Sequence, residues 1–161
     1  MNKRLTWKFI LSNPVYFIAF GFGTGLSPIA PGTVGTLPGY PLYFLLLAFL
    51  PWTTMLVVLT LLFIIGSWWC DIAGKGIGET DHKGIVWDEI IGMAFVLSFT
   101  PETPLWWVLA FFLFRFFDIL KPWPINLVDR NVKNGFGVMF DDLLAAGYAI
   151  ATIKIAGTFF V

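Results

Sequence analysis

The long apolar segments of this chain restrict its fold more than any other feature. Thr53–Cys70 contains no charged residue, and we expect a membrane-spanning helix there that ends in solvent near Ala73. Hydrophobic residues make up 58% of the 161 positions, the mean hydropathy is +0.81, and only 12% of residues are charged. A soluble domain usually carries about a quarter charged residues, so the sequence predicts a protein that lies in the membrane.

The other segments predict an all-α, polytopic membrane bundle with about four to five membrane-embedded helices. A short N-terminal helix from Pro14 to about Phe22 cannot span and is therefore re-entrant or interfacial. Gly21–Thr36 is rich in Gly, Pro, Ser and Thr, and we expect a Gly/Pro-rich active-site loop. Asn126–Asn134 is polar and expected at the interface. We expect one domain over residues 1–161, whose further embedded helices are Leu37–Leu50, Ile85–Phe99, Leu105–Leu120 and Leu143–Val161, the last within a helix that starts near Val138.

Composition also excludes several classes of protein. The formal net charge is zero, so no nucleic-acid partner is expected. Cys70 is the single cysteine, which excludes an internal disulfide and a four-cysteine zinc site. Ser12-Asn13-Pro14 interrupts the apolar stretch that follows Met1–Arg4, so we expect a retained N-terminus and no cleaved signal peptide.

The distribution of lysine and arginine predicts the orientation of the bundle. If the segments alternate in direction, Pro51-Trp52 and Thr100–Pro104 lie on one side, and neither turn contains Lys or Arg. Positive residues favour the cytoplasm, so the opposite side is predicted to be the cytoplasmic face. The positive residues collected at that face are Lys3, Arg4, Lys8, Lys75, Lys83, Lys121, Arg130 and Lys133.

The same topology brings scattered acids together at the cytoplasmic face. Asp88-Glu89 opens one helix, Asp118 closes another, and Asp141-Asp142 opens a third. Acids at membrane depth are costly and usually functional. Adjacent acids point about 100° apart on a helix, so we expect one acid from each pair, together with Asp118, to face a common ion.

This oxygen-rich set of ligands favours a hard divalent cation. Mg²⁺ suits it, because Mg²⁺ keeps several waters and takes phosphate oxygens as ligands. The simpler alternative is that the acids stabilise helix N-termini. That alternative explains either pair but explains Asp118 poorly, since an acid at a helix C-terminus opposes the helix dipole. The predicted metal ligands are Asp88, Glu89, Asp118, Asp129, Asp141 and Asp142.

A phosphate group is predicted to bind beside the metal. Lys121 can bind phosphate as a point charge and Arg130 as a planar fork, although both residues also fit simple anchoring at the cytoplasmic face. Backbone N–H groups of Gly21–Thr36 can cradle an anion, while tight turning is an adequate alternative role for the glycines. The hydroxyl groups expected to contribute are those of Ser27, Thr33 and Thr36, whose alternative role is to cap the next helix.

Missing motifs narrow the reaction that such a site can perform. Cys70 is followed by no arginine at the spacing of a phosphocysteine loop, one histidine cannot supply a two-histidine relay, and no Asp-x-Asp begins a phosphoaspartate motif. A phosphoryl-transferring site here would work through metal, with an activated water as nucleophile. His82 is the only histidine, and its ordinary role is that of a solvated loop residue. Its place shortly before Asp88 on the charged face makes it a candidate catalytic residue.

Several polar motifs follow one another in a specific order along the chain. They are Gly21–Thr33, Asp81-His82 with Ile85–Met93, Phe114–Ile125, Asp129–Val132 and Gly135–Asp142. In these motifs the sequence resembles the phosphatidylglycerophosphatase A family of bacterial inner membranes. The resemblance covers nearly the whole chain, although the hydrophobic tail after Gly147 carries little signal.

The resemblance implies a Mg²⁺-dependent lipid phosphatase of the bacterial cytoplasmic membrane, multi-pass, with its active site on the cytoplasmic face. Its lipid substrate would be phosphatidylglycerol phosphate, which would lose its terminal phosphate. The six acids proposed as metal ligands are the acids of the family's motifs. Which of them bind metal and which position water stays open. The predicted catalytic residues are Asp88, Glu89, Asp118, Asp142 and His82, and the predicted substrate-binding residues are Ser27, Thr33, Thr36, Lys121 and Arg130.

Two functions from other classes compete with this interpretation. Intramembrane acids also mark the paths of ion- or proton-conducting transporters. Against transport, the acids gather on one face and form no chain across the bilayer. A lipid-head-group transferase would need spaced aspartates with Gly and Arg, a motif that the sequence does not contain. The sequence makes no prediction of the oligomeric state.

Overall fold

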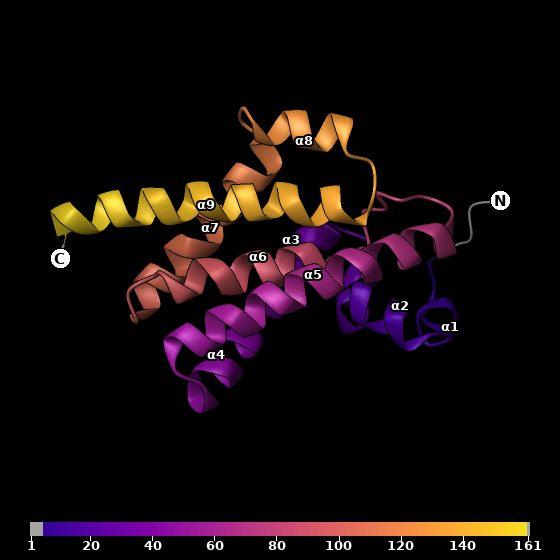
Figure 1. Cartoon of the computed structure of the whole chain (residues 1–161), viewed down its shortest axis with the longest axis horizontal. Helices are drawn as coiled ribbons and strands as arrows, with labels where there is room; N and C mark the ends of the chain where they lie inside the picture. The colour runs from indigo at the N-terminus through magenta and orange to yellow at the C-terminus, as the bar shows by residue number, and fades with distance from the viewer. Residues whose placement is uncertain (1–4, 161) are drawn as a thin grey trace.

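The computed structural model describes residues 5–160. In this part of the chain all regular secondary structure is helical, with no strand (Figure 1). The prediction of an all-α fold is therefore confirmed. The predicted retention of Met1–Arg4 lies outside the described residues. The helices are α1 (Trp7–Ile10), α2 (Pro14–Ala19), the 3-10 helix η1 (Gly21–Leu26), α3 (Pro31–Thr36), α4 (Gly39–Phe49), α5 (Trp52–Ile77), α6 (Trp87–Ser98), α7 (Pro104–Leu120), α8 (Ile125–Asn131) and α9 (Gly135–Phe160).

Helix α6 forms the centre of the bundle. Ten of its 12 residues are buried, and it packs against α4, α5, α7 and α9. Small residues permit this close approach: a Cβ atom at Gly92 would lie 2.7 Å from Phe114 Cζ, and one at Gly39 would lie 2.8 Å from Met93 Cβ. At 1.5 Å per residue, α6 is about 18 Å long, well short of the hydrocarbon thickness of about 30 Å. The first turn of α6 therefore lies inside the protein.

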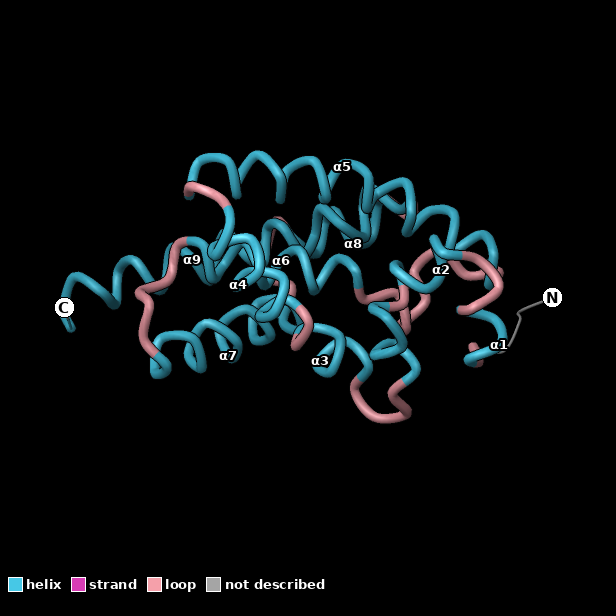
Figure 2. Tube along the Cα trace, turned by 90° about the horizontal axis from the view of Figure 1, so that it is seen from below, coloured by secondary structure: helices cyan, strands magenta, loops and turns pink. Residues whose placement is uncertain are grey.

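The ends of the bundle follow the predicted alternation. The indole of Trp52, at the start of α5, donates a hydrogen bond to the carbonyl of Ser98, at the end of α6, over 2.8 Å. The two turns without Lys or Arg thus lie at one end. The view in Figure 2 shows α1 and the C-terminal end of α9 at opposite ends of the long axis. In Figure 1, α9 lies between α8 and the pair α5 and α6.

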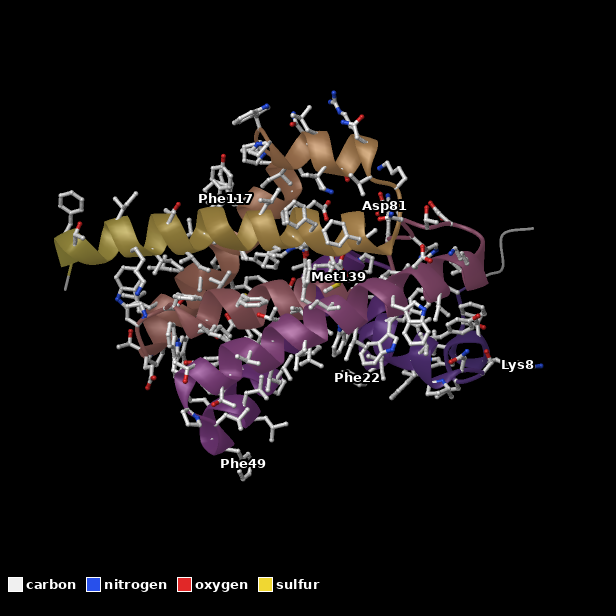
Figure 3. The ribbon with its side chains drawn as sticks, viewed as in Figure 1. Lys8, Phe22, Phe49, Asp81, Phe117 and Met139 are labelled. Carbon is white, nitrogen blue, oxygen red and sulfur yellow. The ribbon has the colours of Figure 1, made fainter. Side chains whose placement is uncertain are left out.

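Three helical segments of the described chain are long and apolar enough to cross a membrane. They are Pro31–Phe49, which joins α3 and α4, then α5, and Gly135–Phe159 of α9. Large apolar side chains cover the outside of the bundle. Phe49, for example, points away from the bundle at the end of α4, whereas Met139 of α9 points inward (Figure 3). These features support membrane association, while the number of spans and a re-entrant N-terminal helix stay predictions.

Several boundaries differ from the sequence-based expectation. The segment Gly21–Thr36 is not one loop, because it forms η1 and α3. Helix α2 ends at Ala19, before Phe22, since Gly21, Phe22 and Gly23 all take positive φ angles of 59°, 58° and 101°. Helix α5 continues past Ala73 to Ile77, where Gly78 adopts φ 93° and ends it.

The two polar segments near the C-terminus were also misjudged in part. Most of Asn126–Asn134 forms α8, which is compatible with the predicted interfacial position, and that position stays a prediction. Helix α9 begins at Gly135, three residues before the expected start at Val138. Asn134 caps this earlier start of the helix, because its side-chain oxygen accepts a hydrogen bond from the N–H of Gly137 over 2.9 Å.

Candidate active site

Three carboxylates from two crossing helices meet beside the first turn of α6. Asp88 and Glu89 belong to α6, and Asp142 projects from α9. They are only 8%, 9% and 3% exposed. Each offers one oxygen atom, and these three atoms all lie within 4.8 Å of one another. We call this group the carboxylate triad.

The triad lacks internal compensation for its charge. Asp88 Oδ1, Glu89 Oε2 and Asp142 Oδ2 are buried and accept no hydrogen bond from any described residue. Like charges at this separation repel, and buried acceptors without a partner are costly. A cation held between the three oxygens would neutralise the repulsion and would give each buried oxygen a partner. The set contains oxygen atoms alone, so it fits a hard divalent ion such as Mg²⁺.

The two adjacent pairs of acids behave differently from each other. Asp141 and Asp142 diverge as expected, and only Asp142 joins the triad. Asp88 and Glu89 both join it, contrary to the expectation that one acid of each pair would face the ion. The extra methylene of Glu89 gives its carboxylate the reach that helix geometry alone does not provide.

Arg115 connects the triad with Asp118 on α7. Its Nη1 atom lies 3.6 Å from Glu89 Oε1 and forms a close ion pair with a carboxylate oxygen of Asp118. Both side chains are almost buried. Asp118 also interacts electrostatically with all three triad carboxylates. The predicted acid of α7 therefore lies beside the triad, but paired with an arginine.

Lys121 forms a second cationic centre. Its Nζ atom lies 2.5 Å from Asp129 Oδ1 and 2.5 Å from Asp141 Oδ2. Burial alone would lower the pKa of Lys121, but the two carboxylates outweigh it and hold this pKa well above its ordinary value. Burial alone would raise the pKa of Asp129, whereas Lys121 lowers it overall. Two of the six predicted metal ligands are thus bound to a lysine.

The backbone of Lys121 contributes to this placement. The residue takes φ 46° and ψ 59°, the left-handed conformation, and its N–H donates to the carbonyl of Phe117 to end α7. A side chain larger than glycine rarely adopts this conformation without compensation. The two ion pairs of Lys121 provide that compensation and turn the side chain toward α9.

A polar cavity of about 470 Å³ opens next to the triad. Glu89 belongs to both, so a molecule in the cavity would reach the triad directly. Gly32 forms part of the wall, and a Cβ atom there would lie 3.0 Å from Arg115 Nη2 and would collide with the Glu89 carboxylate. A larger residue at this position would force the ends of these two side chains to move. The lining residues are Ala30, Pro31, Gly32, Lys83, Glu89, Arg115, Asp118, Ile119 and Lys121.

The other predicted site residues have local contacts. His82 Nδ1 accepts a hydrogen bond from Gly84 N–H over 3.0 Å, and its ring lies edge-on to Phe20. The Ser27 hydroxyl donates to the carbonyl of Ile29, and the buried Thr36 hydroxyl donates to Gly32. Thr33 is half-buried on α3, and Arg130 is exposed on α8. The functional roles of these five residues stay predictions.

Sequence reasoning missed two cations of the cavity wall. Arg115 was assigned no role from the sequence, and Lys83 was counted only among the positive residues of the cytoplasmic face. A signal for Arg115 was present, because an arginine three residues before Asp118 in an otherwise apolar helix carries the cost of burial. No local signal distinguishes Lys83 from the other lysines at this face.

The apolar helical fold and the cavity with its buried carboxylates and cations are compatible with a membrane-associated phosphatase. The family model described as Phosphatidylglycerophosphatase A matches residues 17–157, and the chain belongs to this family. This assignment confirms the resemblance noted in the sequence and makes the protein an enzyme. The acids at one end of α6, α7 and α9 accordingly need no role in ion conduction.

Similar proteins span almost the same length as this chain. The Haemophilus influenzae phosphatidylglycerophosphatase A is 46% identical over 91% of this chain and 90% of its own, and the Escherichia coli phosphatidylglycerophosphatase A is 47% identical over 91% and 86%. A Bacteroides thetaiotaomicron protein, provisionally named as a phosphatidylinositol-3-phosphatase, is 37% identical over 86% and 91%. No solved structure matches the chain.

Proposed function

We propose that this protein removes the terminal phosphate of phosphatidylglycerol phosphate and that the reaction depends on Mg²⁺. The observation that carries the proposal is the triad of buried carboxylates with unpartnered oxygens, beside a cavity lined by three cations. The names of the two relatives from Haemophilus influenzae and Escherichia coli support the choice of substrate.

Asp88, Glu89 and Asp142 would hold the ion. When bound, Mg²⁺ would supply positive charge that polarises the phosphoester and favours deprotonation of water. Water oxygen attacks phosphorus, the ester P–O bond breaks, and the lipid alkoxide takes a proton to become the free hydroxyl of phosphatidylglycerol. Inorganic phosphate is the second product.

The cations of the cavity would bind the phosphate that is transferred. Arg115 presents a planar fork, suited to two phosphate oxygens, and Lys121 presents a point charge. Asp118 holds Arg115 in place, and Asp129 with Asp141 holds Lys121. Fixed charges of this kind stabilise the transition state without reorganising during the reaction. Arg115 would thus add to the phosphate-binding role predicted for Arg130, which is exposed on α8.

The active site would face the cytoplasm in a bacterial inner membrane. The support is the positive charge around the cavity, since Lys83, Arg115 and Lys121 all line it. The acyl chains of the substrate would stay in the bilayer while the head group enters the cavity. The protein would then prefer a lipid phosphate to soluble glycerol 3-phosphate.

The decisive experiment measures phosphate release by the purified protein in detergent. We expect hydrolysis of phosphatidylglycerol phosphate that stops with a chelator and returns with Mg²⁺. Phosphatidylinositol 3-phosphate is the matched competing substrate, because one relative carries a name for that activity. Faster hydrolysis of the inositol lipid would overturn the substrate assignment, and full activity in excess chelator would overturn the metal.

A further inference from the structure

The outer face of α7 carries an apolar groove that leads to the polar cavity. The groove has a volume of about 490 Å³. Its apolar walls belong to the exposed stripe of α7, where large side chains recur at helical spacing and face outward. The residues that line it are Leu109, Phe112, Leu113, Arg115, Phe116 and Ile119.

The groove and the polar cavity share two residues. Arg115 and Ile119 line both, so the groove and the cavity beside Glu89 adjoin at these two residues. From Leu109 to Ile119 the helix rises about 15 Å, which is half of the hydrocarbon thickness of about 30 Å. With α7 oriented across the bilayer, the groove would extend over one leaflet from the level of the head-group cavity.

We propose that this groove binds an acyl chain of the lipid substrate and guides its phosphate to Arg115. The inference rests on the proposed function. The chemistry of the two surfaces is complementary to one amphipathic molecule, since a hydrocarbon chain fits the groove and an anionic head group fits the cationic cavity. Arg115 lies at the junction, where phosphate and glycerol would meet the chain.

A second apolar cavity offers a rival position for the chain. It has a volume of about 260 Å³, and it is lined by residues of η1, α4 and α6 that include Phe22, Leu45 and Trp87. It shares no lining residue with the polar cavity. The α7 groove shares Arg115 and Ile119 with the polar cavity, so it is the favoured site.

Photolabelling of the wild-type protein tests the position directly. The probe is a phosphonate analogue of phosphatidylglycerol phosphate with a diazirine in the middle of one acyl chain. We expect adducts between Leu109 and Phe116, and we expect excess substrate to suppress them. Adducts concentrated around Leu45, or spread evenly over the outside of α5, would overturn the proposal.

Substitutions that fill each surface provide a kinetic test. The readout is the ratio of kcat/KM for a dioleoyl substrate to that for a dihexanoyl substrate. Leu109→Trp should lower this ratio about tenfold, the order expected when a bulky group displaces a packed chain. Leu45→Trp in the rival cavity and Leu61→Trp on the exposed face of α5 should leave it unchanged. A fall in Leu45→Trp and none in Leu109→Trp would contradict the groove.

The two proposals fail in distinguishable ways. If the wild-type protein releases phosphate from no lipid phosphate, the proposed function is wrong. If it hydrolyses the lipid while the probe labels other surfaces, only the groove is wrong. Photolabelling needs no variant, so misfolding of Leu109→Trp would not prevent the decision.

Discussion

Replacement of Asp142 by asparagine tests whether the carboxylate triad binds a metal or only stabilises the fold. The change keeps the size of the side chain and removes one of three charges whose oxygens lie within 4.8 Å. At an effective dielectric constant of about 20, two unit charges at that distance repel by about 3 kcal/mol. Partial protonation and water reduce this repulsion, so we expect the metal-free variant to be more stable than the wild type by about 1–3 kcal/mol.

Mg²⁺ should reverse that order. A ligand at a thousand times its Kd stabilises a folded protein by about 4.1 kcal/mol, more than the difference expected without metal. The wild type should gain this stability, whereas Asp142→Asn should gain much less because it has lost a ligand. Activity should fall by about 10²-fold or more. Opposite effects on stability and activity are the signature of a charged site that is built for a cation.

Tryptophan fluorescence during heating, in chelator and in Mg²⁺, measures both stability effects. Each kcal/mol corresponds to a shift in Tm of about 2–4 °C for a domain of this size. Glu102→Gln, in the exposed turn before α7, is the matched control because it removes one charge far from the triad. A variant that is less stable than the wild type in chelator, with no response to Mg²⁺ in either protein, would refute the metal-binding triad.

Three further outcomes are expected. Arg115→Lys should reduce kcat/KM by at least about tenfold while Mg²⁺ still raises Tm, because lysine keeps the charge but not the planar fork; unchanged kinetics would exclude phosphate binding by this residue. The pKa of Asp129 is lowered in the folded protein, so its pairing with Lys121 stabilises the fold fully above the unfolded pKa of about 3.9. This stability is lost as the pH falls through the lower folded pKa. In an acid titration, Asp129→Asn should therefore lose less unfolding free energy than the wild type. Engineered cysteines at Lys83 and Glu102 should label from opposite sides of the membrane, the former from the cytoplasm, and labelling from the same side would contradict the topology.

The elements that depend on long apolar runs were predictable from sequence. α5 and α9 follow such runs, and the alternation of helices predicts that Asp88, Asp118 and Asp142 lie at one end. That placement needs only helix directions, which turns and charges indicate. The convergence of the acids is therefore a consequence of topology.

The finer arrangement was beyond local sequence patterns. α3 forms in a segment of Gly, Pro and Thr because tertiary packing determines its conformation: a Cβ atom at Gly35 would collide with Val86 on the neighbouring segment. The division of the acids depends on side-chain reach and on the position of two cations. Helix periodicity could not show that Glu89 and Asp88 would both belong to the carboxylate triad. It also could not show that Asp141 would form an ion pair with Lys121.

The enclosed position of α6 has a consequence for the biogenesis of the protein. A ribosome completes α6 and α7 before it reaches α9, yet α9 both covers α6 and carries Asp142. A nascent chain that has reached only α7 therefore holds two acids in a short helix with an incomplete protein wall, a costly arrangement in lipid. We therefore expect stable insertion of α6 to depend on α9, which completes both the wall around α6 and the carboxylate triad.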